Sequence, residues 1–156
     1  MKKKIIIGSI IVFIVDLISK TLINLLLSLE KTITIIPHFF KIEKVYNTGI
    51  SFGLLQGSQI RIILISMIIF IFLLHMQESF LLNKRNTIAF SLLYGGIIGN
   101  LFDRIIYHHV IDFLSFNFGS YHFPVFNIAD SCICIGMILL IIAILLKEDN
   151  RKEDTK

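Results

Sequence analysis

The sequence predicts an all-α membrane protein: four transmembrane helices with a small β-like cradle and a loop on the outer face. Two observations carry this prediction. Hydrophobic residues make up 55% of the 156 residues and charged residues only 17%, whereas a soluble domain averages about 45–50% apolar and about 25% charged residues. The apolar residues also gather in four runs, each near the roughly 20 residues that cross a bilayer. This composition argues against a soluble enzyme, a disordered protein and a nucleic-acid-binding protein.

The four runs define the expected helices. We expect them over residues 5–29, 60–76, 87–107 and 125–146, within one integral membrane domain of residues 1–156. The first run follows a basic segment, as in a secretory signal. No small-residue cleavage site comes after it, so we interpret it as a signal anchor. The third run contains the most glycine and polar residues and is a helix only if the fold tolerates them.

The distribution of lysine and arginine predicts the orientation. Basic residues lie before the first run, between the second and third, and after the fourth: Lys2, Lys3, Lys4, Lys84, Arg85, Lys147, Arg151, Lys152 and Lys156. By the positive-inside rule, both termini and the loop at 77–86 are then cytoplasmic. Residues 30–59 and 108–124 face outward. The formal net charge of +4 is therefore mostly a signal of topology.

The outward segments contain patterns typical of strands and turns. β-branched and aromatic residues cluster over 32–36 and 39–45, and residues 52–55 lie among glycines. We expect these segments to form a small β-sheet or cradle. Residues 117–124 predict a turn with aromatic side chains at the membrane interface. We expect the charged tail at 147–156 to be frayed.

Polar residues inside or beside the apolar runs indicate a functional site. A charged side chain near the bilayer centre costs about 2.5–3.5 kcal/mol even on the lenient insertion scale. We therefore expect such residues to be paired and to face inward. Asp16 and Lys20 are four residues apart and share one helix face. The others lie near the outer ends of the third and fourth runs: Asn100, Asp103, Arg104, Asp112, Asn127 and Asp130.

The depth of these residues predicts that they share one site. Counted from the start of the first helix, Asp16 and Lys20 lie about 16 and 22 Å along it, toward the outside. Counted from the start of the third, Asn100 and Asp103 lie about 20 and 24 Å along it. Asp130 falls in the first turns of a helix that runs inward. All of them converge on the outer third of the bilayer, which random decoration would not predict.

Asp112 and Asp130 have no obvious basic partner, whereas Asp16–Lys20 and Asp103–Arg104 read as pairs that hold helices together. Two carboxyls that meet at a water-accessible edge cannot both ionise easily, so one keeps a proton. In an aspartic protease, one such carboxylate activates water and the other acid polarises the amide carbonyl. Whether these two meet in space is open at this point.

Two other functions would also use buried polar residues. A proton- or ion-coupled carrier would need carboxylates inside the bilayer, although it would spread them across its depth. An assembly factor would use them only to lock helices together.

No motif for a metal, nucleotide or serine nucleophile is present. The five histidines include no helical His-x-x-x-His pair, and the sequence has no Gly-x-Ser-x-Gly elbow and no P-loop. We therefore expect neither a metal nor a cofactor. Gly95 and Gly99 have the spacing of close helix packing, which would bring Asn100 near its neighbours. Cys132 and Cys134 read as small core residues.

Five motifs together resemble the bacterial lipoprotein signal peptidases, also called signal peptidase II. They follow that family's order over nearly the whole chain, at residues 16–20, 47–53, 96–104, 110–113 and 124–130. The resemblance implies a four-helix aspartic endopeptidase of the bacterial inner membrane. Such an enzyme removes the signal peptide from prolipoproteins by cutting before a cysteine that carries diacylglycerol. Asp112 and Asp130 match its catalytic pair.

The resemblance also implies roles for the neighbouring residues. Those that would bind substrate or support the site are Asp16, Lys20, Asn47, Gly49, Gly99, Asn100, Asp103, Arg104, Asn127 and Ala129. The implied partners are lipid-modified prolipoproteins and membrane lipid, without nucleic acid, and we expect a monomer with its active site near the outer leaflet. Ile50 and Ser51 depart from the small residues, often alanines, that the family has there.

Overall fold

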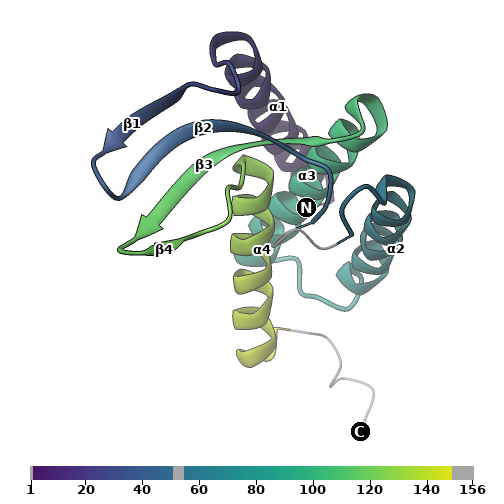
Figure 1. The fold of residues 1–156 in the computed structure, drawn as a ribbon. Helices are drawn as coiled ribbons and strands as arrows, with labels where there is room; N and C mark the ends of the chain where they lie inside the picture. Colours follow the sequence, from purple (N-terminus) through teal and green to yellow (C-terminus); the bar gives the residue numbers. More distant parts are fainter. Residues whose placement is uncertain (1, 51–54, 149–156) are drawn as a thin grey trace, which may run out of the picture.

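Four long helices form a bundle, and a small sheet lies across one end of it (Figure 1). The structure is a computed structural model that describes residues 2–50 and 55–148. The helices are α1 (Lys2–Leu26), α2 (Gln59–Gln77), α3 (Lys84–Tyr107) and α4 (Ile128–Leu145). Each is long and apolar enough to cross a membrane. The predicted combination of four membrane-spanning helices with a small β-structure is confirmed.

Helix α3 is the centre of the bundle. In the membrane-spanning segment of α3, 67% of the residues are buried inside the protein. The corresponding shares for α1, α2 and α4 are 22%, 11% and 22%. Glycines make this possible, because a Cβ on Gly95 would lie 2.5 Å from Val12 Cβ and one on Gly96 would lie 2.6 Å from the backbone oxygen of Ala129. The backbones of α1 and α4 therefore approach α3 more closely than side chains would allow.

The helices begin and end a few residues from the predicted positions, for local reasons. Helix α3 starts at Lys84, three residues early, because the side chain of Asn83 accepts a hydrogen bond from Asn86 N at 2.8 Å and caps it. Helix α4 starts at Ile128, three residues late. Just before it, Phe126 exchanges backbone hydrogen bonds with Leu114, so this segment is extended instead of helical. Helix α1 ends at Leu26, three residues before the predicted end.

The sheet is antiparallel and has the order β1-β2-β3-β4. Its strands are β1 (Thr32–Ile36), β2 (Phe40–Asn47), β3 (Val110–Phe118) and β4 (Tyr121–His122). The first two form where the sequence predicts strands. The prediction of a turn over 117–124 is wrong in extent, because residues 117–118 continue β3 and the chain turns at Gly119, where φ is +64°. The cradle expected from 52–55 and the tail at 147–156 fall mostly outside the described residues.

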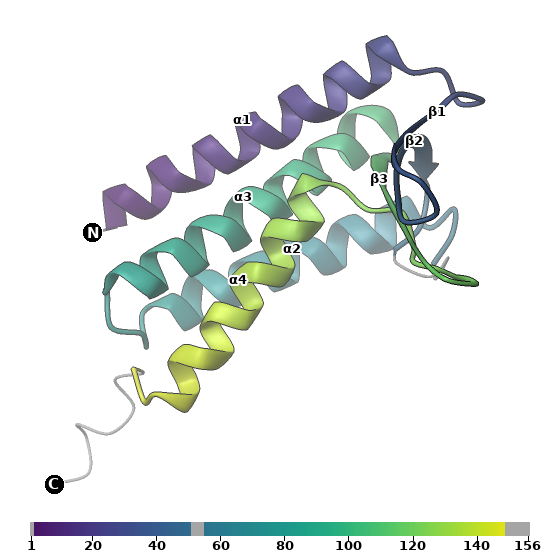
Figure 2. The same ribbon diagram turned by 90° about the vertical axis from the view of Figure 1, so that its left-hand side faces the viewer.

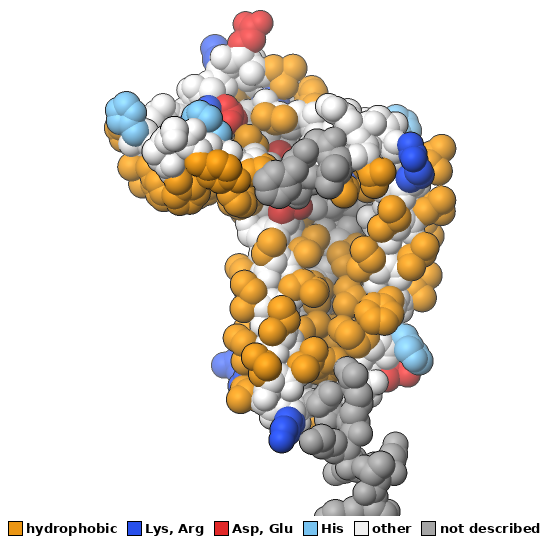
Figure 3. Space-filling model, turned by 60° about the horizontal axis from the view of Figure 1, so that its bottom comes forward, with side chains coloured by type: hydrophobic (Ala, Val, Ile, Leu, Met, Phe, Trp, Pro, Cys, Tyr) orange, Lys and Arg blue, Asp and Glu red, His pale blue; other side chains and the backbone are white. Residues whose placement is uncertain are grey.

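The sheet and the start of α1 lie at opposite ends of the bundle (Figure 2). Because successive helices run in opposite directions, the sheet, the end of α3 and the start of α4 share one end. Hydrophobic side chains cover the flank of the helices and the underside of the sheet, while charged side chains lie near the two ends (Figure 3). This distribution suits a bundle that crosses a bilayer with the sheet at one surface.

We expect Gly96→Ala to destabilise the bundle, because the new methyl would meet the backbone of α4 and not a side chain that can move. Overpacking of this kind costs about 1–3 kcal/mol, so thermal unfolding in detergent should occur at a lower temperature. Ile68→Ala is the control, since Ile68 is 66% exposed on α2. An equal melting temperature for Gly96→Ala and wild type would contradict the close approach.

Candidate active site

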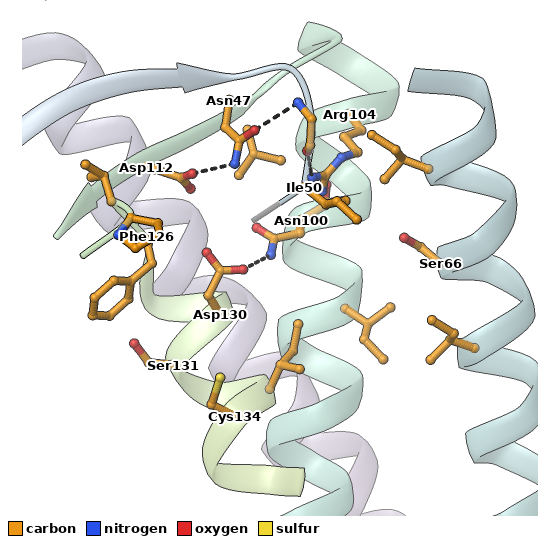
Figure 4. A pocket seen from close by; sticks show the side chains of 18 of the residues that line it. Asn47, Ile50, Ser66, Asn100, Arg104, Asp112, Phe126, Asp130, Ser131 and Cys134 are labelled. Atoms are coloured by element: carbon orange, nitrogen blue, oxygen red, sulfur yellow. Dashed lines mark hydrogen bonds between the residues drawn. The ribbon is translucent and has the colours of Figure 1, made fainter. Parts of the chain in front are cut away.

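The polar residues gather at the sheet end of a groove between α2 and α4 (Figure 4). The groove has a volume of about 930 Å³. Away from the sheet its walls are apolar and include Ile69, Leu93 and Met137. Close to the sheet the lining changes to amide, carboxyl and guanidinium groups: Asn47, Asn100, Arg104, Asp112 and Asp130.

Asp112 enters the site from strand β3 and is 2% exposed. Its Oδ2 accepts a hydrogen bond from Asn47 Nδ2 at 2.8 Å, and its Oδ1 accepts one from Asn127 Nδ2 at 2.7 Å. Asn47 reaches it because β2 pairs with β3, with Val45 opposite Asp112. Burial and, to a smaller extent, the negative charge of Asp130 raise the pKa of Asp112 to about 7, against the opposing effect of the two amides.

Asp130 lies in the first turn of α4. Its Oδ2 accepts a hydrogen bond from Asn127 N at 3.2 Å, and its own N donates to Asn127 Oδ1 at 2.9 Å. The two residues therefore form a capping box that starts the helix. The other carboxyl oxygen, Oδ1, accepts a hydrogen bond from Asn100 Nδ2 at 2.7 Å. The positive end of the helix dipole adds to the stabilisation of a negative charge at this position.

Two amides connect the two carboxyl groups. Asn127 Nδ2, which donates to Asp112, also donates to Asn100 Oδ1 at 3.1 Å. Asn100 in turn donates to Asp130. Asp112 and Asp130, which are 18 positions apart on a strand and a helix, are therefore brought together in one hydrogen-bonded group.

A buried ion-pair cluster lies next to this hydrogen-bonded group of carboxyls and amides. Lys20 Nζ is 2.7 Å from Asp16 Oδ2 and 3.0 Å from Asp103 Oδ2. The expected pair of Asp16 and Lys20 is present. The expected pair of Asp103 with Arg104 is not found, because consecutive residues of a helix point about 100° apart and Asp103 faces Lys20. Arg104 donates instead to Gly49 O at 2.8 Å.

The three small residues predicted for the site each lie against another site residue, and at Gly99 a side chain would not fit. A Cβ on Gly99 would be 2.5 Å from Asp16 Oδ2. Ala129 is fully buried and its N donates to Asp16 Oδ1 at 2.8 Å, which ties α4 to α1. The carbonyl oxygen of Gly49 accepts a hydrogen bond from Arg104, and Gly49 N donates one to Asn47 Oδ1 at 2.9 Å. Each predicted site residue thus contacts at least one other member of the predicted set.

The sequence does not predict a further group that holds β2 in place. Lys44, which is 9% exposed, donates to Asn24 O at 3.3 Å at the end of α1, and Tyr46 donates to Asn24 Oδ1 at 3.0 Å. Gln59 similarly donates to Thr48 O. These bonds position the strand end that carries Asn47. Asn24 is a polar residue inside the first apolar run and could have indicated this group from the sequence. Its partners, however, are 20 and 22 residues away in the chain.

Four helices able to cross a membrane and paired carboxyls in a groove are the parts that a membrane enzyme using acid–base chemistry requires. The model of the family described as signal peptidase (SPase) II matches residues 8–146. The lipoprotein signal peptidase of Bacillus pumilus (strain SAFR-032) is 39% identical over 90% of this chain and 91% of its own length. That of Staphylococcus aureus (strain JH9) is 39% identical over 98% of both chains. The chain belongs to the signal peptidase II family.

Two solved structures, both described as bacterial membrane enzymes, have the same fold. They align with TM-scores of 0.82 and 0.80, at 36% and 35% identity. Each alignment covers 97% of this chain, with 93% and 94% of the other chain.

We expect Asp16→Ala to destabilise the protein by about 3 kcal/mol, the lower end for breaking a buried ion pair. The change removes the 2.7 Å pair with Lys20 and leaves the buried N of Ala129 without its acceptor. Thermal or denaturant unfolding in detergent measures it. Glu43→Ala is the control, because its pair with Lys41 is partly exposed and should contribute at most about 1 kcal/mol. Equal effects for the two variants would refute the structural role of Asp16.

Proposed function

We propose that this protein is an aspartic endopeptidase that removes the signal peptide from prolipoproteins, cutting before a cysteine that carries diacylglycerol. The observation that carries the proposal is the pair of carboxyls, Asp112 and Asp130, joined by two amides at one end of an apolar groove. The names of the relatives support the substrate class. Neither a metal nor a cofactor is needed for this chemistry.

The surroundings of the two carboxyls support different roles for them. Asp130 receives two hydrogen bonds and lies at a helix N-terminus, both of which favour its charged form. We assign it as the base that takes a proton from the attacking water. Asp112, whose pKa is raised to about 7, keeps its proton and donates a hydrogen bond to the carbonyl oxygen of the scissile bond.

The proposed reaction has two steps, the addition of water and the collapse of a tetrahedral intermediate. Water oxygen bonds to the carbonyl carbon, its proton passes to Asp130, and Asp112 transfers its proton to the carbonyl oxygen. When the tetrahedral intermediate collapses, the carbon–nitrogen bond breaks. Asp130 gives its proton to the leaving nitrogen and Asp112 recovers its own from the oxygen. Both carboxyls return to their starting states.

The residues that line the groove support an apolar substrate. The part farther from the sheet is lined by Ile69, Leu93 and Met137 and suits the apolar helix of a signal peptide. Arg104 lines the polar end of the groove. We propose that its guanidinium group donates to a carbonyl of the substrate backbone, because a guanidinium can only donate hydrogen bonds.

We further propose an orientation in the bacterial cytoplasmic membrane. Lys2, Lys3 and Lys4 begin α1, and Lys84 and Arg85 begin α3, both at the end of the bundle away from the sheet. The positive-inside rule supports placing this end in the cytoplasm, with both termini. The carboxyl pair then lies near the outer leaflet, where water and a lipid-modified cysteine are both within reach. We expect the protein to act as a monomer.

The alternative of a proton or ion carrier fits the structure less well. A carrier needs titratable groups along a path across the bilayer. Here Asp16, Lys20 and Asp103 contact one another, and Asn100 connects Lys20 to Asp130. Together they form a compact group at one end of the bundle. An assembly factor without catalysis would tolerate exchange of Asp for Asn in the pair.

Asp112→Asn and Asp130→Asn should each abolish cleavage, because each removes a group that must exchange a proton. General acid–base groups contribute about 10²–10⁴-fold to the rate, so the rate should fall by at least about a hundredfold. A gel-shift assay of a lipidated prolipoprotein measures cleavage, and thermal unfolding verifies that each variant folds. Glu43→Gln, outside the groove, serves as control. Normal cleavage by either folded variant would exclude the proposed mechanism.

The pH profile should report Asp112. Since this group must be protonated to work and its pKa is about 7, activity should fall as the pH rises through about 7. Asn47→Ala removes a hydrogen bond that favours the carboxylate, which raises the pKa of Asp112 and moves the alkaline limb to higher pH. Asn117→Ala, in the distant hairpin, should leave the limb in place. A limb that stays fixed or moves downward in Asn47→Ala would contradict the assignment.

A further inference from the structure

Lys20 makes three polar contacts inside the protein. It is 1% exposed, and its ammonium group has three protons and no lone pair. It forms ion pairs with Asp16 Oδ2 at 2.7 Å and Asp103 Oδ2 at 3.0 Å, and it donates a hydrogen bond to Asn100 Oδ1 at 2.9 Å. The two ion pairs balance its charge. The hydrogen bond goes to a neutral amide that contacts the catalytic pair.

The bond from Lys20 determines which way the Asn100 amide points. A lysine can only donate, so the amide atom that faces it must be the oxygen. The amide nitrogen then faces Asp130 Oδ1 at 2.7 Å and donates to it. The opposite orientation would place an NH₂ group against the ammonium and a carbonyl oxygen against the carboxylate, which is repulsive at both ends.

The Asn127 amide is oriented in the same manner by a second obligatory donor. Its Oδ1 accepts from the backbone N of Asp130 at 2.9 Å. Its Nδ2 therefore faces Asp112 and Asn100 Oδ1. Asn100 Oδ1 thus receives two donors, from Lys20 and Asn127, and its amide has no low-energy alternative.

We propose that Lys20 is a positioning residue of the catalytic site, which fixes the direction of the Asn100 amide so that its NH₂ group always donates to Asp130. The inference rests on the proposed function, because it concerns the readiness of Asp130 to act as the base. Lys20 acts through Asn100 and touches no reacting atom. This role is separate from the ion pairs that Lys20 makes with Asp16 and Asp103.

The charged groups around the pair are few within residues 2–50 and 55–148. Helix α1 contributes Lys20 and Asp16, and α3 contributes Asp103 and Arg104. Strand β2 contributes only the amide of Asn47. Without the donor from Asn100, Asp130 would lose one of the two hydrogen bonds that its carboxyl accepts, and such bonds stabilise a carboxylate. The acidic limb of the pH profile therefore reports the proposed role.

The test needs a variant that removes the donor but keeps the charge balance. Lys20→Met alone would leave Asp16 and Asp103 buried together without a cation. Lys20→Met combined with Asp103→Asn removes one positive and one negative charge, so the net charge of the cluster stays as in wild type. Wild type is therefore the comparison matched in charge, and Asp103→Asn alone is the control for the lost carboxylate, because it keeps the bond from Lys20 to Asn100.

Cleavage of a lipidated prolipoprotein is measured against pH for wild type, Asp103→Asn and the double variant. Relative to wild type, which has the same cluster charge, the double variant should lose about a hundredfold in kcat, as expected when a general base is impaired, with KM unchanged. Its acidic limb should move to higher pH, whereas Asp103→Asn should keep the limb near its wild-type position. A folded double variant with the kcat and acidic limb of Asp103→Asn would overturn the proposal. So would a loss that is uniform across pH.

A second set of variants provides an independent test if the double variant does not fold. Asn100→Ala removes the same donor to Asp130 without touching an ion pair, and should shift the acidic limb in the same direction. With both sets folded, adding Lys20→Met and Asp103→Asn to Asn100→Ala should shift the limb no further, because interactions in series are not additive. An unshifted limb in Asn100→Ala would refute the inference. Wild type that fails to cleave would refute the proposed function itself.

Discussion

The burial of one ammonium group constrains most of this structure. Lys20 lies in the apolar part of the bundle, where an unpaired charge is very costly, so its partners must be held around it. Asp16 comes from α1 and Asp103 from α3. Asp16 also accepts a hydrogen bond from the first turn of α4. Three helices are thereby fixed at one depth, and the proposed site is built on that level.

The site combines elements that have different means of support. Helix α4 begins where Asn127 and Asp130 cap each other, so the geometry that starts the helix also places a carboxyl at its N-terminus. Strand β3 carries Asp112 across the end of the bundle and is held by β2. The two carboxyls therefore have different surroundings, a helix terminus for one and a strand with amide neighbours for the other. Such a difference can assign opposite proton roles to identical side chains.

Much of the fold and of the candidate site can be predicted from the sequence. The thickness of a bilayer requires runs of about 20 apolar residues, and the high cost of charge in hydrocarbon makes Asp16 and Lys20 conspicuous. Strand β3 is not predicted, because its pairing with β2 depends on residues far away in the chain. The partner that the sequence predicts for Asp103 is also wrong. Its neighbour Arg104 is the obvious cation in the sequence, but in the bundle Asp103 faces Lys20.

Length, hydropathy and charge are local properties of the chain, so the membrane class, the number of spans and the identity of the polar residues can be predicted without a structure. The contacts among those polar residues cannot, because they depend on how the helices pack. The bonds from Lys20 to Asn100 and from Ala129 to Asp16 join residues 80 and 113 positions apart. The direction of each asparagine amide follows from such distant donors. No local pattern contains that information, because it arises only when α1, α3 and α4 pack together.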